Sequence, residues 1–314
     1  MAENIYKNIG QNRNRTILLV LLMPLFLIAI IYGLFYAYGL LMEGNTVVQQ
    51  QYYKDIKNLL PSICGGAITI VTIWLFISYF SGSKMILNAA HAKSLTKSDN
   101  PVIYNLVQNL AITAGLPMPK IYVIEDESLN AFATGRNPEN ASITLTTGII
   151  RILNKQELEA VIAHEMSHIG NRDIRLMLLM VAGIGCCTFF GHVLIRSGRG
   201  GRDGAPIMLL GAALLLFGLL LAPLLRLAVS RQREYQADAT GVLLTRNPLA
   251  LASALEKISQ DARVEILDSQ QSVSAMCIAN PLKKTKSLFG SLSGITATHP
   301  PIDERVRRLK AMGR

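Results

Sequence analysis

The stretch NKQELEAVIAHEMSHIGNRDIR, residues 154–175, is the part of this 314-residue chain around which the rest is organised. Its pattern predicts one helix. Asn154 can cap the first turn, and Glu157 follows three residues later, which is the asparagine form of a capping box. From Leu158 to Ile169 no glycine or proline interrupts the chain, and apolar residues recur at helical spacing. We therefore expect a continuous helix over residues 154–175.

Within that helix, His164, Glu165 and His168 form the pattern His-Glu-x-x-His. The histidines are four residues apart, so both imidazoles project from one face, one turn apart. Such a pair suits tetrahedral zinc, which binds neutral imidazole nitrogen and keeps one position open in catalytic sites. Glu165 lies beside the pair, where it can take a proton from an attacking water. The alternative is a solvated helix with two unrelated histidines, which the three fixed letters make the weaker interpretation.

Composition indicates a membrane protein. Half of the residues are apolar, and the mean hydropathy is +0.33. The excess lies in four windows without charge, each long enough to cross a hydrocarbon core of about 30 Å as a helix: residues 16–42, 58–83, 176–195 and 204–225. The first window is too long for the apolar core of a cleaved signal peptide, so we expect an uncleaved anchor. The alternative, buried helices of a large soluble core, fits poorly with four such runs.

The net charge of +10 is compatible with a nucleic-acid partner, but the placement of the basic residues favours a membrane. Basic residues lie beside the apolar windows, as residues retained on the cytoplasmic side do. By this rule the N-terminus and the His164 region are cytoplasmic. One loop is not consistent with this rule. It follows the third window and carries Arg196, Arg199 and Arg202, and a single crossing by that window would place these residues outside. Either this loop is short enough to be carried across the membrane, or the third and fourth windows form a shallow hairpin that does not span the membrane. The four cysteines form no Cys-x-x-Cys pair and are interpreted as small apolar residues.

We expect two domains. Residues 1–83 form an N-terminal anchor of two transmembrane helices, and residues 84–314 form a domain that a membrane hairpin at 176–229 interrupts. Three runs predict short strands of one small sheet: residues 120–124, 130–135 and 142–147. Asn-Pro and Pro-Pro pairs predict helix starts near residues 100, 247 and 300. The fold class is therefore a mainly α membrane protein with four apolar helices and an α+β domain that carries a small β-sheet.

Two histidines need at least one more protein ligand for a catalytic zinc site. Glu234 is the best candidate, because it and Asp238 share one face of a predicted helix after the hairpin. One of them can bind the metal while the other orients a ligand histidine. Other candidates are less suitable: Asp173 is rotated away on the helix, His192 lies in an apolar window, and His91 stands alone in a polar connector. The alternative for Glu234 is a solvated helix start, the better interpretation only without the histidine pair.

Four motifs together resemble the integral-membrane zinc metalloproteases, the family that includes HtpX and the CAAX prenyl proteases, and the chain looks closest to its HtpX branch. The motifs are Asn130-Ala131-Phe132-Ala133, His164-Glu165-Met166-Ser167-His168, Arg233-Glu234-Tyr235-Gln236-Ala237-Asp238, and Thr298-His299-Pro300-Pro301 running to Arg305. The resemblance extends from about residue 81 to the C-terminus. The order of the motifs around the hairpin makes the set specific. It implies a zincin-like catalytic domain of the gluzincin type.

The resemblance implies a role for each motif residue. His164, His168 and Glu234 would bind one zinc ion per chain, Glu165 would be the general base, and Asp238 would support a ligand histidine from behind.

Two further sets complete the site that the resemblance implies. His299 and Arg305 resemble a pair that steadies the oxyanion of the reaction, a step that needs an imidazole and a cation near the metal. A substrate backbone would add to an edge strand, formed by Asn130, Ala131, Phe132 and Ala133. From spacing alone, an ordinary surface strand is the better interpretation of these four residues.

The hypothesis from the sequence is a zinc metalloendopeptidase in the lipid bilayer of the cell inner (plasma) membrane. It would be multi-pass, with its active site on the cytoplasmic side. By resemblance, its polypeptide substrates are misfolded or misassembled membrane proteins. Two alternatives remain: a processing protease that trims one specific peptide or prenylated substrate, and a non-catalytic zinc-bearing membrane scaffold or transporter. No nucleic-acid partner is expected, because the cations follow the membrane ends. The oligomeric state is left open.

Overall fold

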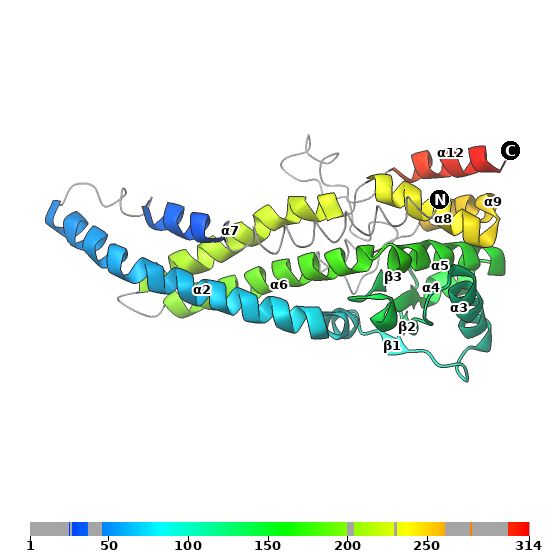
Figure 1. The fold of residues 1–314 in the computed structure, drawn as a ribbon, viewed down its shortest axis with the longest axis horizontal. Coiled ribbons are helices and arrows are strands. Elements are labelled where there is room, and N and C mark those ends of the chain that lie inside the picture. The colour runs from blue at the N-terminus through cyan, green and yellow to red at the C-terminus, as the bar shows by residue number, and fades with distance from the viewer. Residues whose placement is uncertain are drawn as a thin grey trace. The chain divides into compact units, whose positions relative to one another are not determined.

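The described chain divides into two compact units. The computed structural model describes residues 25, 27–36, 46–199, 204–228, 231–260, 277 and 301–313. In these residues, one unit contains Phe80–Leu178 and Leu225–Arg314, and the other contains Arg13–Tyr79 and Leu179–Leu224. The first unit holds a small sheet and the helix with the histidine pair (Figure 1). The second is built from long apolar helices.

The sheet has four strands in the order β1-β2-β4-β3. They are β1 (Lys93–Ser94), β2 (Lys120–Ile124), β3 (Ala131–Thr134) and β4 (Ser142–Thr146). β2 and β4 run parallel, whereas β1 pairs antiparallel with β2, and β3 pairs antiparallel with β4. β3 is therefore an edge strand of the described sheet. The three predicted strands are present. β1 was not predicted, because two residues in a polar connector are too few to show an alternating pattern.

The third predicted strand is one residue too long. Thr147 begins α4 (Thr147–Ile152) instead of ending the strand. Thr146 caps this helix, since its side-chain oxygen accepts a hydrogen bond from the backbone N–H of Ile149. Thr146 and Thr147 are both β-branched, as strand residues often are. The sequence pattern therefore placed the end of the strand one residue too late.

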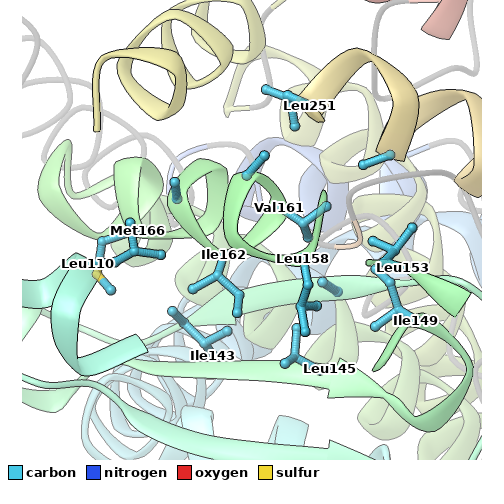
Figure 2. Packing of buried hydrophobic residues seen from close by; sticks show 14 of the residues in the cluster. Leu110, Ile143, Leu145, Ile149, Leu153, Leu158, Val161, Ile162, Met166 and Leu251 are labelled. Atoms are coloured by element: carbon cyan, nitrogen blue, oxygen red, sulfur yellow. The ribbon is translucent and has the colours of Figure 1, made fainter. Parts of the chain in front are cut away.

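The histidine-bearing helix α5 (Lys155–Gly170) is packed on two sides. Its residues Leu158 and Ile162 lie against Ile143 and Leu145 of β4 (Figure 2). On the other side α9 (Pro248–Ile258) covers it, with Leu251 pointing toward α5. Burial of such side chains contributes about 1.5–3 kcal/mol each. The two layers therefore hold α5, and the histidines on it, in one position.

The carboxylate of Glu157 joins the first turn of α5 to α9 by hydrogen bonds. The predicted capping box is present, with Asn154 and Glu157 exchanging side-chain-to-backbone hydrogen bonds. Glu157 also accepts hydrogen bonds from Ser253 Oγ at 2.6 Å and from Lys257 Nζ at 2.7 Å. Burial by itself would raise the pKa of Glu157, but the hydrogen bonds from Lys257, Ser253 and Asn154 outweigh it and lower that pKa. The buried carboxylate is thus kept ionised.

α5 does not continue into the next helix, so the prediction of one helix over residues 154–175 is wrong at its end. α5 ends at Gly170, Arg172 has a φ of 59°, and α6 (Asp173–Gly198) begins at the next residue. A residue with positive φ cannot continue a right-handed helix, so it redirects the chain. Gly170 and Asn171, both weak helix formers, were the sequence signal for this break.

The remaining helices of the first unit are α3 (Pro101–Ala114), α8 (Arg231–Thr245), α9 and α12 (Ile302–Met312). The predicted start and stop of α3 are confirmed: Asn100 accepts from the backbone N–H of Ile103, and Gly115 ends the helix in a left-handed conformation. α12 contacts α9 and α8. The helix predicted from residue 247 to about 262 ends at Ile258, and positions 261 and 262 lie outside the described residues.

In the second unit, α6 and α7 (Gly204–Ala228) lie in close contact. A Cβ on Gly211 of α7 would lie 2.8 Å from the carbonyl oxygen of Gly191 in α6. Small residues at such a crossing let two apolar helices approach closely, as they do inside membranes. Trp74 of α2 (Thr46–Ala89) also meets Phe190 of α6 edge to face, with ring centroids 5.8 Å apart.

Two described helices are long and apolar enough to cross a membrane by length and composition: Asn58–Ala89 and Asp173–Gly198. Leu27–Tyr36 and Ile207–Leu219 are shorter apolar helices. The fold is therefore mostly helical, with a small mixed sheet and two to four apolar helices. Four membrane spans, and the division into residues 1–83 and 84–314, stay predictions. The first apolar window, 16–42, is described only at residues 25 and 27–36.

Replacement of Glu157 by alanine should destabilise the first unit by about 2 kcal/mol, because the change removes a cap and leaves the partner groups unpaired. The check is the thermal unfolding midpoint of the detergent-solubilised protein. Gln156→Ala is the matched control, since this side chain lies one residue away and is exposed. Equal midpoints for the two variants would show that the carboxylate does not join the helices.

Candidate metal centre

Three side chains from two helices converge on one point. His164 and His168 come from successive turns of α5, and Glu234 comes from the first turn of α8. The two Nε2 atoms are 3.2 Å apart. The Glu234 carboxylate lies 3.7 Å from His164 Nε2 and 3.6 Å from His168 Nε2. Among the described residues, these three form the group whose ligand atoms lie within 4.8 Å of one another.

The spacing of these atoms fits a tetrahedral zinc ion. Zn–N and Zn–O bonds of about 2.0–2.1 Å place tetrahedral ligand atoms roughly 3.3 Å apart. The observed separations of 3.2–3.7 Å are close to that value. The imidazole rings meet at 89°, with centroids 4.8 Å apart, so the rings do not stack, and their Nε2 atoms approach each other. The donor set, two imidazoles and one carboxylate, is that of catalytic zinc sites.

A carboxylate behind each imidazole defines which nitrogen faces the metal position. Asp238 Oδ1 lies 3.0 Å from His164 Nδ1, and Asp173 Oδ2 lies 3.1 Å from His168 Nδ1. Each Nδ1–H donates to its carboxylate, which leaves the lone pair of each Nε2 directed at Glu234. Three electron-rich atoms then face one another in a buried space. Such an arrangement is unfavourable unless a proton or a metal ion lies between them.

The net charge of the buried cluster also fits a divalent ion. Four carboxylates are buried here, together with two guanidinium groups: Glu165, Glu234, Asp238, Asp173, Arg233 and Arg305. These carboxylates outnumber the guanidinium groups by two, and a divalent ion that displaces the proton of His168 would balance this excess. The donor chemistry, the spacing and the charge therefore agree on the kind of ion that the site fits.

Arg305 is the central cation of the cluster. Its side chain is 0% exposed. It donates to Asp238 from Nε at 2.9 Å and from Nη2 at 2.7 Å, and Nη1 lies 3.4 Å from Glu234. Burial by itself would raise the pKa of Asp238, but the charge of Arg305 outweighs it and lowers that pKa. The structure thus brings Arg305 to the site, while its action on an oxyanion stays a prediction.

The acid–base chemistry of His168 follows from its neighbours. Burial by itself lowers the pKa of this imidazole. The hydrogen bond to Asp173 and the charges of Glu234, Asp173 and Glu165 outweigh that effect and raise the pKa to about 9. Without a metal, His168 is therefore protonated at neutral pH, and a metal ion has to displace this proton.

Glu165 is placed beside the ligands and not among them. It belongs to the buried face of α5 and is 2% exposed. Its charge acts on His168 and Arg305. The rings differ in access, since the His168 side chain is 16% exposed and that of His164 is 1% exposed. Of the two imidazoles, that of His168 is therefore the more accessible.

The predicted substrate strand lies at the edge of the sheet. Asn130 precedes β3, and its backbone N–H and C=O are both bonded to Thr146. Ala131, Phe132 and Ala133 belong to β3, which has β4 as its one neighbour among the described strands. The contact of β3 with α5 brings this strand to the histidine-bearing helix. Its substrate role stays a prediction.

One predicted site residue cannot be placed, and one contact was missed. His299 lies outside the described residues. Asp173 was considered only as a ligand and rejected because a continuous helix would rotate it away. The break at Arg172 instead turns Asp173 toward His168 Nδ1. The Gly170-Asn171 pair was the signal that could have corrected this view.

The helix that supplies Glu234 packs closely on α5 because of a glycine. Glu234, Asp238 and Gly241 share one face of α8. A Cβ on Gly241 would lie 3.2 Å from the backbone nitrogen of His164 and 3.4 Å from its Cα. The neighbouring atoms are helix backbone, which cannot move aside as a flexible side chain can. Gly241 therefore allows the approach that places both carboxylates at the histidines.

A group of two imidazoles and a carboxylate, on a His-Glu-x-x-His helix and a second helix, is typical of the metallopeptidase class. The family model described as Peptidase family M48 matches residues 97–313. The chain belongs to peptidase family M48.

Relatives of this chain carry protease names. "Protease HtpX homolog" of Bacteroides fragilis (strain YCH46) is 43% identical over 263 residues, which cover 81% of this chain and 80% of that protein. The protein of the same name from Streptococcus uberis (strain ATCC BAA-854 / 0140J) is 38% identical over 320 residues, covering 98% of this chain and 100% of that protein. The resemblance inferred from the four motifs is confirmed, and these matches support a membrane metalloprotease.

A solved structure, Ste24p of S. mikatae, matches this chain with a TM-score of 0.44 and 20% sequence identity. The match covers 83% of this chain and 66% of that one, just under two thirds of its length.

Zinc binding to the metal-free protein should weaken as the pH falls below about 9, because the proton on His168 competes with the metal for Nε2. The expected loss approaches ~10-fold per pH unit. Calorimetry in two buffers of different ionisation enthalpy, at about pH 7, should show release of about one proton per zinc ion. Release of no protons, with unchanged affinity across this range, would contradict the raised pKa.

Replacement of Gly241 by valine should push α8 away from α5 and reduce zinc occupancy, with strain of about 1–3 kcal/mol from overpacking. Zinc content of the purified protein, measured by elemental analysis after dialysis, checks this. Ala239→Val is the control, because it makes a β-branched residue at a partly exposed position of the same helix. If both variants keep one zinc per chain, close packing at this glycine does not set the position of Glu234.

Proposed function

We propose that this chain is a membrane-bound, zinc-dependent endopeptidase. The observation that carries the proposal is the convergence of His164, His168 and Glu234 beside the buried Glu165. The relatives named as proteases support the activity. When bound, zinc would supply a Lewis acid that polarises the scissile carbonyl and makes water more acidic.

The protein residues supply proton transfer in this proposal. The Glu165 carboxylate takes a proton from the attacking water and later gives it to the leaving amine. Its near-complete burial keeps bulk water from competing for that proton. Arg305 and His299 would stabilise the developing oxyanion. The buried guanidinium of Arg305 beside Glu234 and Asp238 supports a role for its charge near the reacting groups.

A peptide substrate would bind by strand addition at β3. The edge position of β3 in the described sheet supports this mode, because one side of the strand has no strand neighbour among the described residues. The residues of β3 are buried, so a peptide has to reach a covered edge in this proposal. The contact between β3 and α5 supports it further, since a peptide along this edge would pass near the histidine-bearing helix. Asn130, which precedes β3, has its backbone held by Thr146 and so helps to keep the strand in place.

The substrates in this proposal are misfolded or misassembled membrane proteins. α6, an apolar helix of spanning length, begins at Asp173, five residues after His168 in the chain. This short connection supports an active site that works close to a membrane. Basic residues beside the apolar windows support a multi-pass protein of the cell inner membrane with the site on the cytoplasmic side. A protease in that place meets the exposed segments of other membrane proteins first.

Glu165→Gln tests the activity directly. The variant should keep one zinc per chain but lose cleavage of casein and of itself, because an amide cannot accept the proton. Elemental analysis gives the zinc content, and gel electrophoresis with mass spectrometry follows cleavage. Glu159→Gln, on the same helix and partly exposed, is the control that should keep full activity. Retained cleavage in Glu165→Gln would remove the proposed base.

The same measurements separate the alternatives. Cleavage at many sites of unfolded membrane proteins supports quality control. Cleavage at one fixed site in one peptide or prenylated protein indicates a processing protease. A Glu165→Gln variant with full cellular function indicates a non-catalytic scaffold or transporter, since only a catalytic role depends on that carboxylate.

A further inference from the structure

The hydrogen bond between Asp173 and His168 joins the metal centre to the start of α6. Asp173 is the first residue of α6 and is 5% exposed. Its Oδ2 lies 3.1 Å from His168 Nδ1. The contact exists because the chain turns at Arg172, whose positive φ places the first turn of α6 beside the last turn of α5. A carboxylate in this place restricts rotation of the ring and holds its Nε2 toward Glu234.

A second contact joins Asp173 to the far end of the α6–α7 hairpin. Arg233 Nη1 lies 3.7 Å from Asp173 Oδ1, and Arg233 is 7% exposed. Arg233 directly precedes Glu234 on α8, the helix that follows the hairpin. The two ends of the hairpin therefore meet in one buried ion pair. In this pair, Asp173 bonds to His168, and Arg233 directly precedes Glu234 in the chain.

We propose that Asp173 is a positioning residue for His168 and that Arg233 holds Asp173 in place, so that this ion pair couples the two ends of the hairpin to the geometry of the metal centre. The inference rests on the proposed function, because it assigns the residues to a zinc site. Neither residue touches substrate or the metal. Asp173 acts through His168, and Arg233 acts through Asp173.

Two features distinguish this role from ordinary helix packing. The carboxylate uses one oxygen for His168 and the other for Arg233, so each contact orients the other. His164 has a related arrangement, in which Asp238 Oδ1 contacts both the imidazole and Arg305 Nη2, while Oδ2 accepts from Arg305 Nε. Both ligand imidazoles are thus held by a carboxylate that is itself held by a guanidinium. Removal of such a partner from a ligand histidine lowers metal affinity by about 10–100-fold.

The test measures zinc affinity of the full-length protein in detergent, by competition with a chromophoric chelator. Asp173→Ala should weaken zinc binding by about 10–100-fold. Asp173→Asn, which keeps an oxygen that accepts from Nδ1–H, should stay closer to the unchanged protein. Cobalt substitution gives a second readout, since a freed His168 ring should shift the d–d absorption bands in Asp173→Ala and not in Asp173→Asn.

Arg233 is tested by a double-mutant cycle. Arg233→Gln should weaken zinc binding less than Asp173→Ala does, and it should add little when Asp173 is already alanine, because its effect passes through that carboxylate. Arg231→Gln is the matched control, two residues earlier on α8 and exposed. If Asp173→Ala does not fold, the comparison of Arg233→Gln with Arg231→Gln decides, and equal zinc affinities overturn the proposal.

The outcomes separate this inference from the proposed function. If the unchanged protein binds no zinc, the proposed function fails. If the unchanged protein binds zinc and Asp173→Ala binds it equally tightly with an unaltered cobalt spectrum, the positioning role alone is wrong. A lower unfolding midpoint of the metal-free variant with unchanged zinc affinity also overturns it, because that is the result of a purely structural contact.

Discussion

The convergence of three lone-pair donors in a buried space is the constraint on which this unit depends. His164 and His168 turn their Nε2 atoms toward Glu234, and a carboxylate on the far side of each ring prevents the opposite orientation. Electron-rich atoms in such proximity repel one another unless a proton or a metal ion lies between them. The packing around them has to supply the energy that holds them there. The layers of sheet, α5 and α9 provide that packing, with α5 buried on both sides.

The buried charges form two sets, each with one carboxylate and one guanidinium group. Asp238 and Arg305 support His164, whereas Asp173 and Arg233 support His168. Removing charged groups from water is costly, and the cost is offset only when each charge has good partners. The cations come from chain segments remote from α5 in the sequence, Arg233 from α8 and Arg305 from α12. The candidate metal centre is therefore also a junction of the fold, and its residues come from four helices, α5, α6, α8 and α12.

Chain order explains why the two ends of the hairpin meet at this junction. α6 and α7 leave the first unit after Leu178 and return at Leu225, and Gly191 and Gly211 allow them to pack closely. Within the first unit, the ion pair between Asp173 and Arg233 brings together the chain segments on either side of the hairpin, and the candidate ligands are divided between α5 and α8. Membership of peptidase family M48 agrees with this division, since the family match extends across the hairpin, over residues 97–313.

The sequence by itself determined the local features: the capping box of α5, the start and stop of α3, three short strands, the histidine pair and the candidacy of Glu234. Each depends on residues a few positions apart, where helical spacing and capping chemistry act directly. Only the tertiary structure decided that Asp173 supports His168, that Arg305 lies buried against Asp238, and that Gly241 permits the approach of α8. These contacts join segments that no periodic pattern relates. They arise because a two-residue break redirects α6 and because close-packed helices bring distant charges into one low-dielectric space.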